Sequence, residues 1–120
     1  MKSIPELVLF AKASTETEHF RPDSVKIVSG DPRQTIRNHF SDAMGQFHAG
    51  EWTGEMGEWR VEYSEQEFCL ITRGVVKIRS DDGQEYTLKA GDAFVIPSGF
   101  KGYWQVLEAV HKYYVIFEPT

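Results

Sequence analysis

Cysteine is almost missing from this chain, since Cys69 is the only one among 120 residues. An intrachain disulfide is therefore excluded, and no run of cysteine and histidine has zinc-finger spacing. Long hydrophobic runs are also missing. The longest runs, residues 7–11 and 113–117, are far shorter than the roughly 18 apolar residues that a membrane span needs. The sequence thus predicts neither a disulfide-stabilised protein nor a membrane partner.

The chain likewise lacks an excess of positive charge. Thirteen Lys and Arg residues against eighteen Asp and Glu give a net charge of −5. This charge repels a phosphate backbone, so we expect no nucleic-acid partner. The apolar stretch near the N-terminus, residues 7–11, is shorter than the hydrophobic region of about 7–15 residues in a signal peptide. We therefore expect it to be part of the fold and the protein to be cytoplasmic.

Helical patterns are rare, whereas signals for short strands recur. Five prolines and ten glycines interrupt the chain, and the intervals between them are rich in β-branched and aromatic residues. The Asp82-Gly83 pair favours a tight hairpin between two alternating segments. We predict a helical turn over 7–13, a loop over 31–41, and strands over 26–28, 45–53, 58–63, 67–72, 75–79, 84–88, 93–96, 103–108 and 112–117. So many short strands favour a sandwich or a barrel.

Two motifs in the second half of the chain follow the pattern of a known family. Glu67 is followed after six residues by Gly74, and Gly91 is followed by Pro97 and Gly99. From 54 to 106 the sequence resembles the cupin superfamily, in particular the short single-domain group of ureidoglycine aminohydrolase-like and ethanolamine-utilisation (EutQ-like) cupins. The resemblance implies an all-β fold, a double-stranded β-helix (jelly-roll) cupin barrel. We expect residues 46–120 to form this barrel and residues 1–45 to form an N-terminal arm that packs on it or on a dimer partner.

The resemblance also implies a metal site for which this chain lacks most ligands. In metal-dependent cupins, three histidines and one glutamate hold a divalent ion, and Glu67 stands at the glutamate position. If three residues separate the second histidine position from Glu67, the first two histidine positions fall on Val61 and Tyr63, and if four do, they fall on Arg60 and Glu62. The third histidine position falls on Gly102. One carboxylate does not provide the three or four ligands of such a site, so we expect no metal cofactor. A weaker alternative is an atypical site formed by Glu67 and His48.

Strand alternation predicts which side chains face the barrel interior. If the ligand positions point inward, the inward set is Trp59, Val61, Tyr63, Glu67, Cys69, Ile71, Trp104 and Val106. On the opposite face we expect Phe68, Leu70, Val76 and Ile78, which would meet the second sheet or a partner subunit. The pattern therefore predicts an aromatic chamber with one acid, in a protein that forms a homodimer.

Glu67 is the candidate catalytic residue. A carboxylate in an apolar cavity without a metal tends toward a raised pKa, which suits a general acid or base. The alternative is a structural role, in which Glu67 only accepts hydrogen bonds from its neighbours. Cys69 has no activating base in the pattern and is interpreted as a small buried hydrophobic residue. The expected ligand-binding residues are Trp52, Trp59, Arg60, Tyr63, Glu67 and Trp104.

These features predict a metal-free cupin that binds a small polar metabolite, such as a ureido, amino-acid or sugar derivative. Whether Glu67 also makes it a weak enzyme stays open. One alternative is a metal-dependent enzyme of the aminohydrolase type with atypical ligands. The other is a non-catalytic binding or regulatory module whose outer sheet holds a partner.

Overall fold

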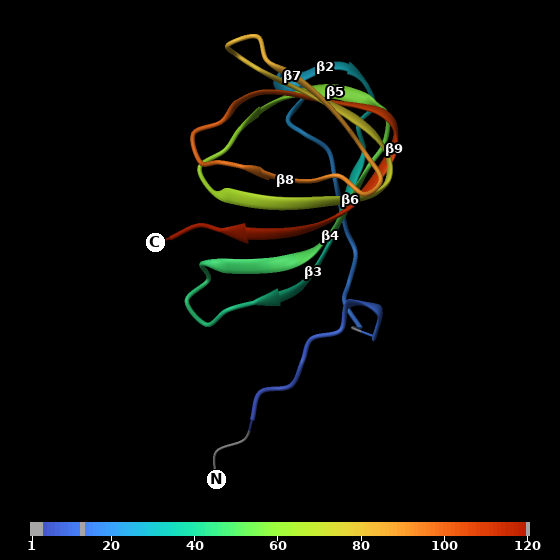
Figure 1. Ribbon diagram of the computed structural model, residues 1–120. Helices are drawn as coiled ribbons and strands as arrows, with labels where there is room; N and C mark the ends of the chain where they lie inside the picture. Colours follow the sequence, from blue (N-terminus) through green and yellow to red (C-terminus); the bar gives the residue numbers. More distant parts are fainter. Residues whose placement is uncertain (1–3, 13, 120) are drawn as a thin grey trace.

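The computed structural model describes residues 4–12 and 14–119, which form antiparallel strands and two 3-10 turns (Figure 1). The strands are β1 (Glu18–Phe20), β2 (Ile27–Gly30), β3 (Gln34–Ser41), β4 (Phe47–Gly54), β5 (Gly57–Glu62), β6 (Gln66–Ser80), β7 (Glu85–Lys89), β8 (Ala93–Ile96) and β9 (Lys101–Phe117). The turns are η1 (Phe10–Lys12) and η2 (Ser24–Lys26). No described helix is long and apolar enough to cross a membrane.

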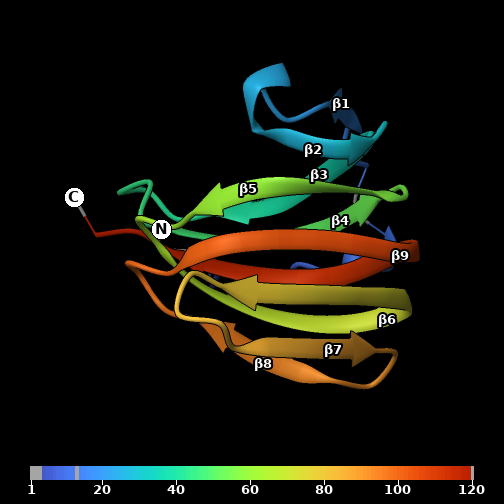
Figure 2. The ribbon, with the colours of Figure 1, turned by 90° about the horizontal axis from the view of Figure 1, so that it is seen from above.

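Two long strands organise the sheet. The main order is β1-β3-β4-β9-β5-β2, and β6 pairs with β9, β7 and β8. β9 pairs with β4 along its C-terminal half and with β5 along its N-terminal half, while β6 follows it along both. Because β6 and β9 both curl, the sheet closes on itself as a jelly-roll barrel (Figures 1 and 2). This all-β fold is the predicted one.

A bend in β6 changes which of its side chains face inward. The register between β6 and β9 shifts around Arg73 and Val75, where Gly74 adopts a φ of 90°. A Cβ at Gly74 would collide with the carbonyl oxygen of Ala109, so the close approach of the strands needs glycine. Before the bend the odd-numbered residues of β6 face inward, and after it the even-numbered ones do. Val76 and Ile78 are accordingly buried in the core. Their prediction as outward-facing residues is therefore wrong.

Several local predictions can be compared with the strands. The hairpin at Asp82-Gly83 is confirmed between β6 and β7. Each of the long strands β6 and β9 joins two predicted strands. The predicted loop over 31–41 is wrong, because β3 covers most of it and pairs with β4. The predicted helical turn is a short one, η1, and residue 13 at its predicted end lies outside the described residues.

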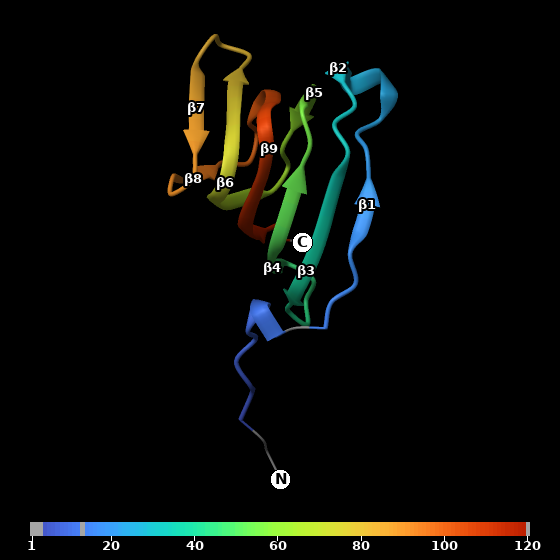
Figure 3. The ribbon, with the colours of Figure 1, turned by 90° about the vertical axis from the view of Figure 1, so that its right-hand side faces the viewer.

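The first forty residues contribute strands to the barrel sheet as well as an extended arm. β1 and β3 extend the sheet beyond β4, and β2 pairs with β5. Before β1, the segment from Ile4 leaves the barrel (Figure 3). Its apolar side chains Ile4, Leu7, Val8 and Leu9 are exposed.

The core lies between the curled halves of the sheet, where three tryptophans pack together. The ring centroids of Trp52, Trp59 and Trp104 are 5.5–6.3 Å apart. The buried apolar set consists of Trp52, Trp59, Cys69, Ile71, Val76, Ile78, Ile96, Trp104, Val106, Val110 and Tyr114. The tryptophans form one wall of the chamber described next.

Candidate functional site

A cavity of about 270 Å³ opens among β3, β4, β5, β6 and β9. Half of the twelve lining residues are aromatic, and four others are polar or charged. The lining residues are Phe20, Gln34, Ile36, Trp52, Trp59, Tyr63, Glu65, Glu67, Trp104, Lys112, Tyr114 and Ile116. Four of the eight side chains that strand alternation places inside line the cavity, namely Trp59, Tyr63, Glu67 and Trp104.

Glu67 has a cationic partner inside this cavity. The ammonium nitrogen Nζ of Lys112 lies 2.8 Å from Oε2 of Glu67, and the two side chains are only 5% and 7% exposed. Glu67 is on β6 and Lys112 on the neighbouring strand β9, so the pairing of the strands holds both groups. The prediction of a solitary acid in the chamber is therefore wrong.

The ammonium of Lys112 is also flanked by aromatic rings. Its Nζ lies 4.7 Å from the ring centroid of Trp52 and 4.4 Å from that of Trp104. The thiol sulfur of Cys69 is 3.6 Å away. A cation at these distances from ring faces is attracted by their quadrupoles, most strongly where water is excluded. The carboxylate and the rings together thus offset the removal of the ammonium from water.

These contacts determine the protonation of the buried groups. Burial is the largest single effect and lowers the pKa of Lys112, but the charge of Glu67, the contact with Cys69 and the hydrogen bonds to both groups together outweigh it, so the pKa of Lys112 is raised and the side chain stays an ammonium. Burial raises the pKa of Cys69 to about 12. Burial, together with the Glu67 charge, also raises the pKa of Tyr63. Cys69 and Tyr63 therefore stay neutral at ordinary pH, and the charges of the cluster are those of Glu67 and Lys112.

Two further groups determine the polarity of the walls. The indole nitrogen of Trp52 donates a hydrogen bond of 2.9 Å to the side-chain oxygen of buried Gln34. The Tyr114 hydroxyl donates one of 2.7 Å to Asn38. The buried indole nitrogen of Trp104 has no hydrogen-bond partner among the residues described. Trp52 is thus fixed in orientation by Gln34, whereas the ring of Trp104 is contacted by the other two tryptophans and by the Lys112 ammonium.

The predicted ligand-binding residues separate into two groups. Trp52, Trp59, Tyr63, Glu67 and Trp104 all line the cavity. Arg60 does not. It lines a neighbouring surface depression, and its guanidinium is held by both carboxylate oxygens of Asp81, one of them at 2.8 Å. The structure therefore brings together five of the six predicted residues.

The residues at the family's metal-ligand positions do not fit a metal ion. Gly102 has no side chain, and a Cβ there would collide with the carbonyl oxygen of Arg79 on β6. His48 lies near the start of β4, where its Nδ1 is 2.7 Å from the hydroxyl of Ser41 on β3 and its Nε2 is 3.1 Å from the Gly45 carbonyl oxygen. Across residues 4–12 and 14–119, no group of three or more His, Cys, Asp or Glu could hold a metal ion. Both ring nitrogens of His48 thus contact its own hairpin, and the atypical pair of Glu67 and His48 stays a prediction.

Sequence reasoning missed Lys112 and Gln34. The signal for Lys112 was its place in the alternating pattern of β9. Every second residue of a strand lies on the same face, so Lys112 shares a face with Val110, Tyr114 and Ile116. The general rule that charged strand residues face water led away from it. Gln34 carried no comparable signal, because its segment was expected to be a loop.

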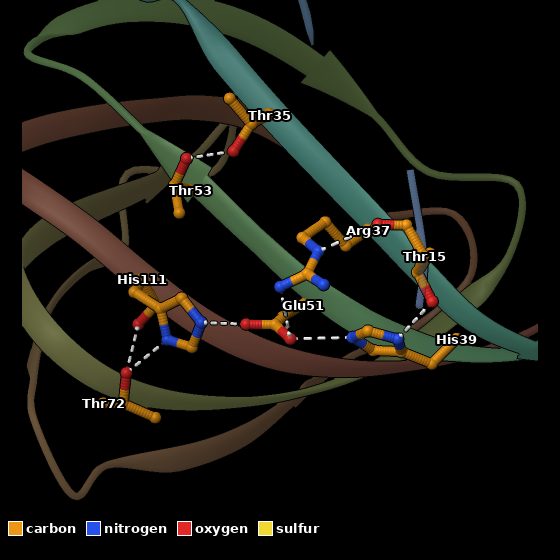
Figure 4. Close-up of polar contacts among 8 residues, drawn as sticks. All are labelled: Thr15, Thr35, Arg37, His39, Glu51, Thr53, Thr72 and His111. Carbon is orange, nitrogen blue, oxygen red and sulfur yellow. Dashed lines mark hydrogen bonds and ion pairs between the residues drawn. The ribbon is translucent and has the colours of Figure 1, made fainter. Parts of the chain in front are cut away.

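A second polar cluster lies on the outer face of the sheet (Figure 4). The Glu51 carboxylate accepts hydrogen bonds from Nε2 of His39 at 2.7 Å and from Nε2 of His111 at 2.8 Å. The other ring nitrogens of the histidines contact the hydroxyls of Thr15 and Thr72. The two Nε2 atoms contact different oxygens of Glu51, so both histidines can be bound at the same time. The resulting chain of hydrogen bonds links β3, β4 and β9, and it holds the arm at Thr15.

Comparisons with known proteins agree with the fold. A protein of unknown function of the DUF861 family from Pseudomonas syringae pv. tomato superposes with a TM-score of 0.77 at 22% identity, over 88% of this chain and 45% of that chain. A DUF861 family protein from Thermotoga maritima is 36% identical over 53% of this chain and 73% of that chain, with a TM-score of 0.52. An ectoine synthase from P. lautus has a TM-score of 0.65 and 19% identity, over 82% of this chain and 72% of that chain.

A search among curated proteins gave no match. The match to a family, by contrast, covers more than half of the sequence: residues 41–114 match the EutQ-like cupin domain. This range contains β4 to β8 and most of β9, and with them Glu67, Lys112 and the three tryptophans of the cavity. The chain therefore belongs to the family of EutQ-like cupins.

Proposed function

We propose that this cupin binds a small polar metabolite in the cavity beside Glu67. The observation that carries the proposal is the combination of one buried ion pair with tryptophan walls in a chamber of about 270 Å³. Ligand pockets combine apolar and aromatic walls with a few placed polar groups in this way. The volume is below the ~300–1,000 Å³ of common ligand pockets, which favours a small ligand.

The unused polar atoms of the walls indicate the chemistry of the ligand. Among the described residues, Oε1 of Glu67 and the side-chain amide nitrogen of Gln34 have no hydrogen-bond partner. The Glu67 oxygen can therefore accept a hydrogen bond from a ligand, and the Gln34 amide can donate one to it. A ligand that carries both a donor and an acceptor satisfies them together. Ureido compounds, amino-acid derivatives and sugar derivatives all have such pairs, and their planar or apolar faces can stack on Trp59.

The experiment is a titration of tryptophan fluorescence with a panel of these three compound classes. We expect saturable quenching by at least one class, and at least tenfold weaker binding in Glu67→Gln, because an amide in place of the carboxylate loses a charge-assisted hydrogen bond. Glu62→Gln is the matched control, since Glu62 is an exposed carboxylate on β5. Unchanged affinity in Glu67→Gln, or no quenching by any compound, contradicts the proposal.

An enzymatic role is a second candidate, favoured by the contact between a carboxylate and an ammonium in one cavity. In such a pair, Glu67 can accept a proton from a ligand while Lys112 stabilises a developing negative charge. The name of the ectoine synthase shows that a protein of similar fold is an enzyme. Turnover of a panel compound by the wild-type protein, lost in Glu67→Gln, supports this role. Turnover that persists in Glu67→Gln removes Glu67 from the mechanism.

We further propose that two copies of the chain associate through the outer face of the sheet. Phe68 on β6 is 41% exposed there, and Tyr113 and Phe117 on β9 and Phe47 on β4 are exposed on the same face. Phe10 lies on this face too, with its ring centroid 5.7 Å from that of Tyr113. The apolar segment 4–9 therefore leaves the barrel from the outer face (Figure 3).

A second copy covers both apolar surfaces at once. If two outer faces meet around a twofold axis, each arm lies within reach of the other copy, and one self-complementary interface buries the exposed aromatics and the arms together. Sedimentation velocity should show a dimer in the wild-type protein and a monomer in the double variant Leu9→Ser, Phe68→Ser. Val25→Ser, at an exposed valine on η2, should remain dimeric. A monomeric wild-type protein contradicts the proposal.

A further inference from the structure

We propose that the ammonium of Lys112 is the resident cation of the cavity and takes the place of a metal ion beside Glu67. The site then excludes divalent metals and organic cations, and admits neutral or anionic ligands. The first part of this inference is independent of ligand binding. The second part rests on the proposed function, since it names the charge class of the metabolite.

The contacts of Lys112 are those of a bound cation. Its Nζ has the Glu67 carboxylate at 2.8 Å and the ring faces of Trp52 and Trp104 at 4.7 and 4.4 Å. A carboxylate combined with aromatic faces is the arrangement with which proteins bind alkylammonium ligands. Here the chain itself provides both the binding site and the cation, because Lys112 is a buried residue of strand β9.

The remaining family positions reinforce this assignment. Gly102 cannot carry a ligand side chain without moving the backbone of Arg79. A metal ion at Glu67 would also have to displace Lys112, which would leave a buried ammonium without its counter-ion. Because Glu67 and Lys112 neutralise each other, a second cation beside this pair would meet the ammonium, and the carboxylate left to it is the half-buried Glu65, which already accepts a hydrogen bond from the Ser64 amide. The position beside the buried ion pair thus favours ligands without positive charge.

Chemical rescue tests the inference. Lys112→Ala removes the propylammonium part of the side chain, and we expect it to lower the melting temperature. n-Propylammonium should then raise that temperature by about 3 °C or more, because binding to the folded state stabilises it. n-Propanol has a similar shape but no charge, and should restore much less. Lys77→Ala is the matched control, since Lys77 on β6 is 3.7 Å from the exposed carboxylate of Glu85. Neither it nor the wild-type protein should respond to n-propylammonium.

Equal rescue by n-propanol, or no rescue, overturns the inference. If Lys112→Ala folds in neither additive, calorimetric titration of the wild-type protein with Zn²⁺ and Mn²⁺ decides. Stoichiometric binding of either metal that is lost in Glu67→Gln overturns it, and absence of such binding supports it. These readouts do not involve a metabolite, so failure of the ligand panel leaves them interpretable. If the panel does yield ligands, preferred binding of cationic members contradicts the predicted charge class.

Discussion

Glu67 and Lys112 are 45 residues apart in the chain, yet their charged atoms lie 2.8 Å apart on paired strands inside the barrel. Removing one partner leaves a buried charge without compensation. We therefore expect Glu67→Gln and Lys112→Met each to lower the free energy of unfolding by about 3–5 kcal/mol. The double variant leaves no unpaired charge in the barrel. Its free energy of unfolding should therefore fall by less than the sum of the two single losses.

Urea unfolding of the wild-type protein and the three variants measures this coupling. The exposed pair of Lys77 and Glu85, 3.7 Å apart, is the control and should show a coupling of about 1 kcal/mol or less. Strictly additive losses at Glu67 and Lys112 would mean that the two groups do not interact in solution.

A second prediction concerns alkaline pH. Burial raises the pKa of the Cys69 thiol from 9.0 to about 12, so the folded protein keeps a proton that the unfolded chain releases. The unfolded state binds fewer protons over this window, and stability falls as pH rises above 9. The contribution is about 1.4 kcal/mol per pH unit.

Cys69→Ala isolates this contribution. Between pH 9 and 10 its free energy of unfolding should fall less steeply than that of the wild-type protein. The comparison uses urea unfolding at several pH values. Parallel slopes for the two proteins would show that the thiol is not protected from ionisation.

A third prediction tests the close approach of β9 to β6. A Cβ at Gly102 would collide with the Arg79 carbonyl oxygen, so Gly102→Ala should destabilise the protein by about 3 kcal/mol, the upper range for overpacking. Gly45→Ala is the control. Gly45 has a φ of 69° and open space around it, so only backbone strain of about 1 kcal/mol is expected. Equal losses would mean that the strands separate easily at Gly102.

Particular residues show how far the sequence can be interpreted. The spacing of Glu67, Gly74, Gly91 and Pro97 predicted the cupin fold, because turns and motif residues are local signals. Strand alternation is also a local pattern, and it correctly placed Trp59 and Trp104 in the core. Val76 was placed on the wrong face, since the register shift near Gly74 depends on contact with β9 and is invisible in a single strand.

Lys112 was missed because its burial is a property of the assembled barrel. A lysine on a strand is expected to face water, and the carboxylate and rings that offset its desolvation are distant in sequence. β3 was taken for a loop because its hydrogen bonds are made with β4 and its side chains are largely polar. Long-range pairing, rather than local pattern, determines both features.

A last prediction concerns the outer cluster and the arm. Hydrogen bonds from His111 and His39 hold the pKa of Glu51 below its ordinary value, against the effect of burial. A lowered pKa contributes stability that is present above pH 4.5, the ordinary value of the carboxyl, and is lost as pH falls through the folded pKa. Glu51→Gln should therefore be less stable than the wild-type protein at pH 7, and the difference should shrink in acid.

The arm provides a local readout of the same cluster. Thr15 contacts Nδ1 of His39 at 2.8 Å (Figure 4). The ring of Phe10 lies 4.5 Å from that of His39, so loosening His39 should free the arm. Hydrogen exchange at neutral pH should become faster over residues 10–18 in Glu51→Gln, while β7 stays unchanged because it lies in another part of the barrel. Glu85→Gln, on β7, is the control. Equal exchange over residues 10–18 in both variants would show that Glu51 does not anchor the arm.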